Sequence, residues 1–109
     1  FDAVVFNPSG KNVLIEIDGR QHFWDRYHLT RWPCSLESDV EKQDLAAENG
    51  YPIVRVSQTW IWNNRASDIW KRWLTTAIAA AEDAQFVIRK EDVVIYQYHT
   101  AGETDIRLV

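Results

Sequence analysis

The sequence is poor in cross-linking and turn-forming residues: its 109 residues include one cysteine, no methionine, four glycines and three prolines. A single cysteine, Cys34, excludes an internal disulfide, and no Cys/His cluster has the spacing of a structural zinc site. No apolar run approaches the roughly 18 residues of a membrane span, and the first residues lack the pattern of a signal peptide. We therefore expect an intracellular protein with no membrane partner.

Positive charge is also scarce, since 16 acidic residues outnumber 12 basic ones and give a net charge of -4. This balance argues against a protein that coats DNA without specificity, because such binding depends on Lys and Arg contacts to phosphates. Several acids could, however, hold a cation that reverses the local sign. The length suits one folded domain over residues 1–109. The chain does not begin with Met, so we expect this domain to be truncated at its N-terminus.

Apolar periodicity predicts strands and helices that alternate along the chain. Two β-branched runs flank a cluster of turn residues at 7–11, which indicates a hairpin that is apolar on both faces. Ser38 and Glu41 form a capping-box pattern before the first helix, and Ser67 can cap the second. We therefore predict an α/β fold with a mixed central β-sheet flanked by helices. The predicted strands span 1–6, 12–17, 52–57, 85–89, 93–98 and, more weakly, 105–109, and the predicted helices span 39–49 and 69–81.

Three acids converge in the predicted hairpin. If Phe6 pairs with Asn12, Asp2 lies directly opposite Glu16, with Cβ atoms about 4.5–5.5 Å apart, and Asp18 extends from the same face. Like charges so close in a half-buried sheet are unfavourable unless protons or a cation offset them. Hard oxygen ligands of this kind suit Mg²⁺, with Mn²⁺ as a substitute. We therefore predict that Asp2 and Asp18 are the main metal ligands and that Glu16 is a further metal-binding acid, although a different loop length would shift the register.

Further polar residues follow this end of the hairpin. His22 comes four residues after Asp18, past a glycine that lets the chain turn, and a neutral histidine can act as a general base towards water. Asp39 begins the first predicted helix and Lys42 lies one turn later on the same face, so they could add an acid and a cation. Such a set predicts phosphodiester hydrolysis, in which a metal polarises the phosphate and a base activates water.

Four segments carry these residues in a distinctive order. They are Phe1-Asp2-Ala-Val-Val, then Leu14-Ile-Glu16-Ile-Asp18-Gly19-Arg-Gln21-His22-Phe23, then Asp39-Val-Glu-Lys42, then Glu48-Asn-Gly50-Tyr51-Pro-Ile-Val-Arg55-Val. This succession resembles the PD-(D/E)XK endonuclease superfamily over about residues 1–62. It is most similar to the branch around very-short-patch-repair endonucleases and Glu-Asp-x-His-Asp homing endonucleases.

The resemblance implies a restriction-endonuclease-like fold and a Mg²⁺-dependent endonuclease that cleaves DNA in homing, repair or restriction. It implies that Asp2, Glu16 and Asp18 are the metal-binding acids. His22 matches the family's catalytic histidine, and Asp39 matches its final acid.

Two features depart from the family pattern. Asp18 stands where the Glu-x-Lys motif has its lysine, so His22 or Lys42 would have to take over that role. The upstream helical glutamate of the branch has no counterpart in this chain. An inactive nuclease-like module that binds nucleic acid or a protein partner is therefore the main alternative. A hydrolase of other phosphate esters is a second.

The segment between Asp18 and Glu37 has no periodicity and mixes basic with aromatic residues. Loops of this length are usually functional. We predict that it contacts DNA, with a locally packed lid as the equal alternative. The predicted nucleic-acid contacts are Arg20, Gln21, Trp24, Arg26 and Arg31.

Each candidate also has a plain structural interpretation. Asp18-Gly19 alone is a common turn dipeptide, and His22 alone is more often a surface or packing histidine. Asp39 alone favours the N-terminus of a helix. The sequence leaves open a homodimer and a flanking DNA-recognition domain outside this chain.

Overall fold

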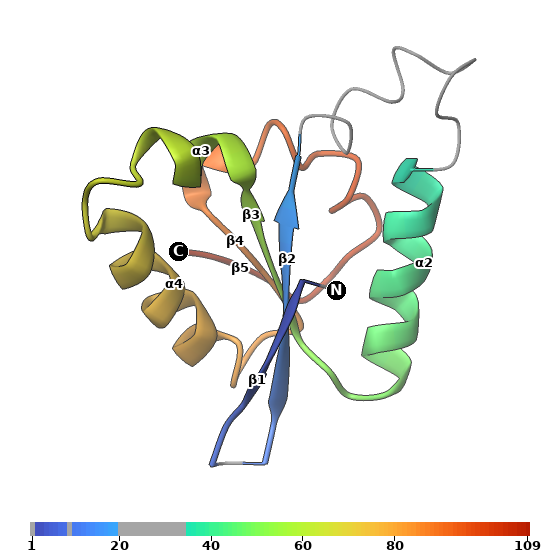
Figure 1. Cartoon of the computed structure of the whole chain (residues 1–109). Coiled ribbons are helices and arrows are strands. Elements are labelled where there is room, and N and C mark those ends of the chain that lie inside the picture. The colour runs from blue at the N-terminus through green and yellow to red at the C-terminus, as the bar shows by residue number, and fades with distance from the viewer. Residues whose placement is uncertain (1, 9, 20–34) are drawn as a thin grey trace.

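The chain forms an α/β structure around a five-stranded mixed sheet, as predicted (Figure 1). The computed structural model describes residues 2–8, 10–19 and 35–109, without the side chains of residues 35–37. The sheet has the order β1-β2-β3-β4-β5, in which β1 is antiparallel to β2 and the other neighbours are parallel. The strands are β1 (Ala3–Phe6), β2 (Asn12–Asp18), β3 (Ile53–Ser57), β4 (Phe86–Ile88) and β5 (Ile106–Leu108).

The hairpin of β1 and β2 has the predicted register, with Phe6 opposite Asn12. Gly10 adopts a φ of 91° in the turn, and its amide donates to the Asn7 carbonyl over 3.0 Å. Because side chains alternate along a strand, Leu14 lies on one face of the sheet while Val13 lies on the other. Both faces are buried there, which explains why β2 is apolar on both sides.

Helices cover both faces of the sheet (Figure 1). Helix α2 (Ser35–Glu48) connects β2 to β3 on one face, and α3 (Gln58–Asn63) and α4 (Ile69–Ala80) connect β3 to β4 on the other. The two predicted helices are thus confirmed, with α2 beginning four residues earlier than expected. Helix α2 ends at Glu48, and Gly50, two residues later, has a φ of 75° in the left-handed region.

The two faces of the sheet have separate apolar cores. On the α4 face, the strand residues Val13, Ile15, Val54 and Val87 pack against Ala77, Ala81 and Ala84. Trp73, Leu74 and Ile78 of α4 also pack around this cluster, whereas Ile69 at the start of the helix is 47% exposed. On the α2 face, a second cluster contains Leu14, Ala46, Ile53, Phe86, Ile88 and Tyr96.

The predicted strand at 93–98 is wrong. Residues 93–99 form turns after the short 3-10 helix η2 (Lys90–Asp92), and the Tyr96 amide donates to the Asp92 carbonyl in a helix-like contact. Val94 is 71% exposed, whereas Tyr96 and His99, three residues apart, are buried. The β-branched residues therefore lie outside the core, and the burial pattern follows a helical turn instead of a strand.

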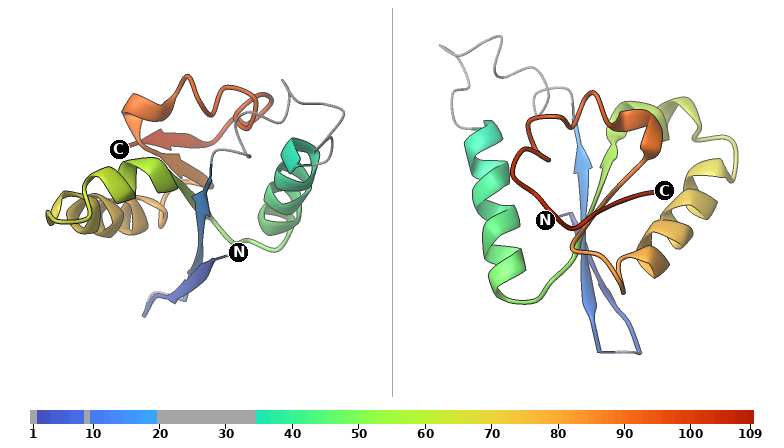
Figure 2. Two further views of the ribbon diagram at one scale, coloured as in Figure 1. Left: turned by 45° about the horizontal axis from the view of Figure 1, so that its top comes forward. Right: turned by 180° about the vertical axis from the view of Figure 1, so that it is seen from behind.

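This turn segment approaches α2 on its way from β4 to β5 (Figure 2, right). The weakly predicted strand at the end of the chain is confirmed as β5, which pairs with β4. Within the described ranges, no helix is both long and apolar enough to cross a membrane.

Candidate functional site

Buried polar side chains gather on the α2 face of the sheet, near the carboxyl ends of β2 and β3. Such residues are unusual in a core, because burying a charge is costly unless it is paired. In open parallel sheets, ligands commonly bind outside the carboxyl ends of the strands. The buried polar residues of this cluster are Glu16, Asp18, Asp39, Gln43, Arg55 and His99.

Arg55 lies at the centre of the cluster and is fully buried. Its Nη1 lies 2.6 Å from Asp18 Oδ1, and its Nε donates to Gln43 Oε1 over 2.8 Å. Its Nη2 lies 3.6 Å from Asp39 Oδ1. Burial by itself lowers the pKa of Arg55, but the carboxylates of Asp18 and Asp39 outweigh it, so that the pKa is raised. The guanidinium therefore stays charged and links β3 to β2 and α2.

Two residues of the turn before β5 complete the network. The Tyr96 hydroxyl donates to Asp18 Oδ2 over 2.7 Å, and His99 Nε2 lies 2.9 Å from Asp39 Oδ2. Because a carboxylate accepts hydrogen bonds, this contact requires the His99 proton on Nε2. Burial and the negative charge of Asp18 raise the pKa of Tyr96 well above its usual value. The phenol therefore acts as a donor to Asp18.

Glu16 is a third acid of the cluster and is 6% exposed. It is the register partner of Arg55 across β2 and β3, and Asp18 lies two residues further along the same face. Burial raises the pKa of Glu16, Asp18 adds to the rise, and Arg55 and Lys42 oppose it. Lys42 on α2 is the weakest of these influences on Glu16, and its role in the site stays a prediction.

Asp2 lies at the exposed edge of this cluster. Its amide donates to the Ile15 carbonyl over 3.0 Å, and its Oδ2 accepts from the Ile17 amide over 2.6 Å. Both contacts flank Glu16 on β2, and extending the pair Ala3–Ile15 by one residue puts Asp2 across from Glu16. The hairpin thus brings Asp2 to the strand position at which it was predicted.

The structure brings together a large part of the predicted site. Asp2, Glu16, Asp18, Asp39 and Lys42 lie around the ends of β2 and α2 on one face of the sheet. Among the residues that the structure describes, no three His, Cys, Asp or Glu side chains form a group that could hold a metal ion by themselves. The other predicted residues, His22, Arg20, Gln21, Trp24, Arg26 and Arg31, lie outside the described residues.

Sequence reasoning missed four members of the network: Gln43, Arg55, Tyr96 and His99. Arg55 carried a usable signal, because a charge inside the apolar run Ile53–Ser57 requires a buried partner. Tyr96 and His99 gave no such signal, since their neighbours Val93, Val94 and Ile95 suggest a strand. Their spacing of three residues is meaningful only once this segment is known to turn.

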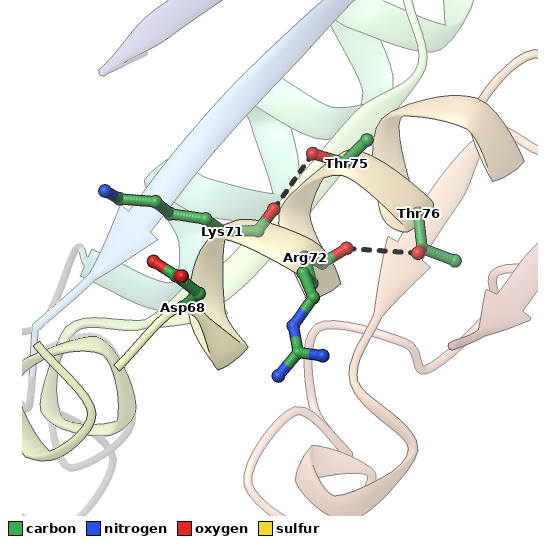
Figure 3. Close-up of a pocket in the computed structure, with 5 residues that line it drawn as sticks. All are labelled: Asp68, Lys71, Arg72, Thr75 and Thr76. Atoms are coloured by element: carbon green, nitrogen blue, oxygen red, sulfur yellow. Dashed lines mark hydrogen bonds between the residues drawn. The ribbon is translucent and has the colours of Figure 1, made fainter. Parts of the chain in front are cut away.

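A shallow groove also lies on the outer face of α4 (Figure 3). It is lined by Asp68, Lys71, Arg72, Thr75 and Thr76. The two threonine hydroxyls donate to the carbonyls of Lys71 and Arg72 within the helix, over 2.9 and 3.0 Å. All five residues are exposed, so the groove offers no buried polar group to a ligand. The carboxylate cluster on the opposite face is therefore the better candidate site.

The chain matches no protein-family model, no curated protein and no solved structure. The resemblance to the PD-(D/E)XK superfamily accordingly rests on the order of the motifs in the sequence.

Proposed function

We propose that the protein is a metal-dependent endonuclease that hydrolyses DNA phosphodiester bonds. The observation that carries this proposal is the excess of acids at the ends of β2 and α2. Glu16, Asp18 and Asp39 are buried there, Asp2 lies at the edge, and Arg55 is the buried guanidinium among them. Such an excess favours the binding of a cation.

Asp2 and Glu16 are the best ligands for that cation. Mg²⁺ commonly takes one or two protein carboxylates and completes its shell with water and phosphate oxygens, so two acids suffice. Burial raises the pKa of Glu16, and a bound cation would offset the cost of its charge. Asp18 was predicted as a main ligand, but both of its carboxylate oxygens accept hydrogen bonds, from Arg55 and from Tyr96, so we propose Glu16 in its place. Mn²⁺ offers a similar preference for oxygen and is a suitable substitute.

The remaining roles fall to residues of this chain around the cation. Bound Mg²⁺ would polarise the scissile phosphate. Lys42, which acts electrostatically on Glu16, would stabilise the added negative charge of the transition state. His22 would accept a proton from the attacking water, and Asp39 would hold the α2 side of the site. The basic residues Arg20, Arg26 and Arg31 would bind the DNA together with the amide of Gln21 and the indole of Trp24.

We further propose that the protein has a restriction-endonuclease-like fold. Its support is the hairpin that places Asp2 beside Glu16, followed by a helix and a parallel strand. A homodimer and an additional DNA-recognition domain remain predictions from the sequence.

One observation favours a second candidate, an inactive nuclease-like module that binds nucleic acid. Both carboxylate oxygens of Asp18 accept hydrogen bonds, from Arg55 over 2.6 Å and from Tyr96 over 2.7 Å. Asp18 is also only 1% exposed. An acid held in this way stabilises a core, and it would do so with or without catalysis.

Cleavage assays separate the two candidates. Purified protein is incubated with supercoiled plasmid and with duplex, single-stranded and mismatched DNA, in Mg²⁺, in Mn²⁺ and in chelator. We expect metal-dependent cutting that falls by about 100-fold or more in Asp2→Asn and Glu16→Gln, because each loses a metal ligand. Asp44→Asn, which removes an exposed acid on α2, should retain full activity.

The outcomes are distinct. If no DNA is cut in any metal, the enzyme proposal fails, and DNA binding without cutting identifies the inactive module. If small phosphodiesters are cleaved in preference to polynucleotides, the protein is a hydrolase of another phosphate ester. If Asp44→Asn loses as much activity as Glu16→Gln, the assignment of the site is wrong.

A further inference from the structure

The described side chains of helix α2 make few apolar contacts with the sheet. Along its described side chains, 38–48, the buried positions are Asp39, Gln43 and Ala46, which share one face of the helix. Of these, only Ala46 belongs to the apolar cluster on the α2 face. Polar contacts of Asp39 and Gln43 therefore help to hold the part of α2 that carries Asp39 and Lys42.

Those polar contacts come from Arg55 on β3 and from the turn between β4 and β5, which approaches α2 in Figure 2 (right). His99 contacts α2 twice, through Nε2 to Asp39 Oδ2 over 2.9 Å and through its backbone carbonyl, which accepts from Gln43 Nε2 over 3.1 Å. Three residues earlier, the Tyr96 hydroxyl donates to Asp18 on β2 over 2.7 Å. One turn of the chain thus contacts both α2 and β2.

The two side chains form a firm unit, which we name the Tyr96–His99 clamp. Both residues are at most 2% exposed, and their rings meet edge to face with centroids 5.3 Å apart. The Thr100 amide donates to the Tyr96 carbonyl over 2.9 Å and fixes the turn between them. Arg55 also connects β2 with α2, because it donates hydrogen bonds to both Asp18 and Gln43.

We propose that Tyr96 and His99 are positioning residues for the metal site: through Asp18 and Asp39 they set the placement of α2 against β2. This inference rests on the proposed function, because β2 carries Glu16 and α2 carries Lys42. Neither clamp residue needs to touch DNA or metal in order to act. Loss of either contact would let α2 move away from the acids of β2 while the sheet stays intact.

Amide hydrogen exchange reports on the placement of α2 and does not depend on nuclease activity. In Tyr96→Phe, which removes only the hydroxyl, we expect the amides of α2 to exchange about tenfold faster or more, since a hydrogen bond to a charged group is lost. The amides of β3 should keep their protection. The control is Tyr51→Phe, because Tyr51 is 41% exposed and contacts Gln85 through its backbone carbonyl.

Two variants of His99 test the contact to Asp39 independently and keep the test valid if one variant fails to fold. His99→Phe removes the donor to Asp39, whereas His99→Gln retains an N–H donor near the position of Nε2. We expect faster exchange of α2 in the first variant and partial recovery of protection in the second. Unchanged exchange of α2 in both Tyr96→Phe and His99→Phe would overturn the clamp, and so would equal losses in His99→Phe and His99→Gln.

Kinetics then test whether the clamp positions the site. We expect kcat for DNA cleavage to fall about tenfold in Tyr96→Phe, with KM for DNA within about twofold and a higher Mg²⁺ requirement. Faster exchange of α2 with unchanged kcat and Mg²⁺ requirement would overturn the positioning role. Absence of cutting by the wild-type protein would instead refute the proposed function, and the exchange data would still decide whether the clamp exists.

Discussion

At the scale of single residues, Arg55 is the largest fully buried side chain in the described part of the chain. Its guanidinium is fully buried between carboxylates from β2 and α2. A buried ion pair can contribute little net stability, because desolvation offsets the attraction. Removing one partner is different, since it leaves the opposite charges buried without compensation.

Replacing Arg55 with methionine should therefore be strongly destabilising. We expect the free energy of unfolding to fall by about 3–5 kcal/mol, as for other broken buried pairs. Urea denaturation at neutral pH measures the loss. Arg65→Met is the control, because Arg65 stacks on the exposed ring of Trp62 at 4.2 Å and should contribute about 1 kcal/mol or less. Equal losses in the two variants would show that the network does not carry the charge balance assigned to it.

Asp92 gives a prediction about pH. Burial raises its pKa above the ordinary 3.8, although the ion pair with Arg89 at 2.9 Å opposes the rise. Its Oδ2 is buried and has no hydrogen-bond partner in the described part of the chain. A carboxyl whose folded pKa is raised stabilises the fold below the unfolded pKa, and that contribution is lost as the pH rises through the folded value.

The variant Asp92→Asn should therefore gain stability relative to the wild type as the pH rises above about 4. The asparagine keeps an acceptor for Arg89 and carries no charge to bury. The measurement is the difference in unfolding free energy between variant and wild type across pH 4–8, with Asp44→Asn as the exposed reference. A difference that stays flat with pH, or that falls, would contradict the raised pKa.

At the scale of elements, the end of α2 depends on one backbone conformation. Gly50 has a φ of 75°, and the amides of Gly50 and Tyr51 donate to the carbonyls of Ala47 and Ala46, over 3.1 and 2.8 Å. A Cβ built on Gly50 would meet no atom within 4 Å. Any cost of a side chain there therefore arises from the backbone alone.

We expect Gly50→Ala to lower the free energy of unfolding by about 1 kcal/mol, because alanine disfavours this region. Gly50→Asn should cost less, since asparagine tolerates the left-handed conformation. Thermal or urea unfolding of the two variants provides the comparison. A loss in Gly50→Asn larger than in Gly50→Ala would mean that α2 does not end in this way.

The segment 93–98 was wrongly predicted as a strand because its tertiary contacts differ from those its composition suggests. A run of Val93, Val94 and Ile95 favours a strand by composition, yet these side chains are 39–71% exposed. The segment contributes to the core through Tyr96, and through His99 to the polar network. Local propensity was overridden by those two tertiary contacts, which suit a turn.

At the scale of the whole molecule, a bound cation should stabilise the fold. A ligand that binds only the native state adds about 2.7 kcal/mol at a concentration 100 times its Kd. We expect the melting temperature to rise with increasing Mg²⁺ or Mn²⁺, and the rise to disappear in Glu16→Gln. Asp44→Asn should keep it. A rise of equal size in Glu16→Gln would place the cation elsewhere.

The sequence alone determined the parts of the protein that depend on local pattern. The length of the hairpin loop predicted the register that brings Asp2 to Glu16. A capping-box pattern predicted α2, and helical periodicity predicted α4. Turn length and side-chain periodicity act between residues that are close in the sequence, so they can be recognised from the sequence alone. These features were enough to gather the acids of the candidate site on one face.

Only the tertiary structure decided what surrounds those acids. Arg55 reaches Asp18 across 37 residues, and Tyr96 reaches it across 78. Contacts at such separations leave no periodicity in the sequence, because they arise from the packing of elements that the chain brings together from afar. The physical reason is burial. Because β2 and β3 lie side by side in a covered sheet, an unpaired charge on either strand would be costly, and the charges pair with residues that only the fold brings close.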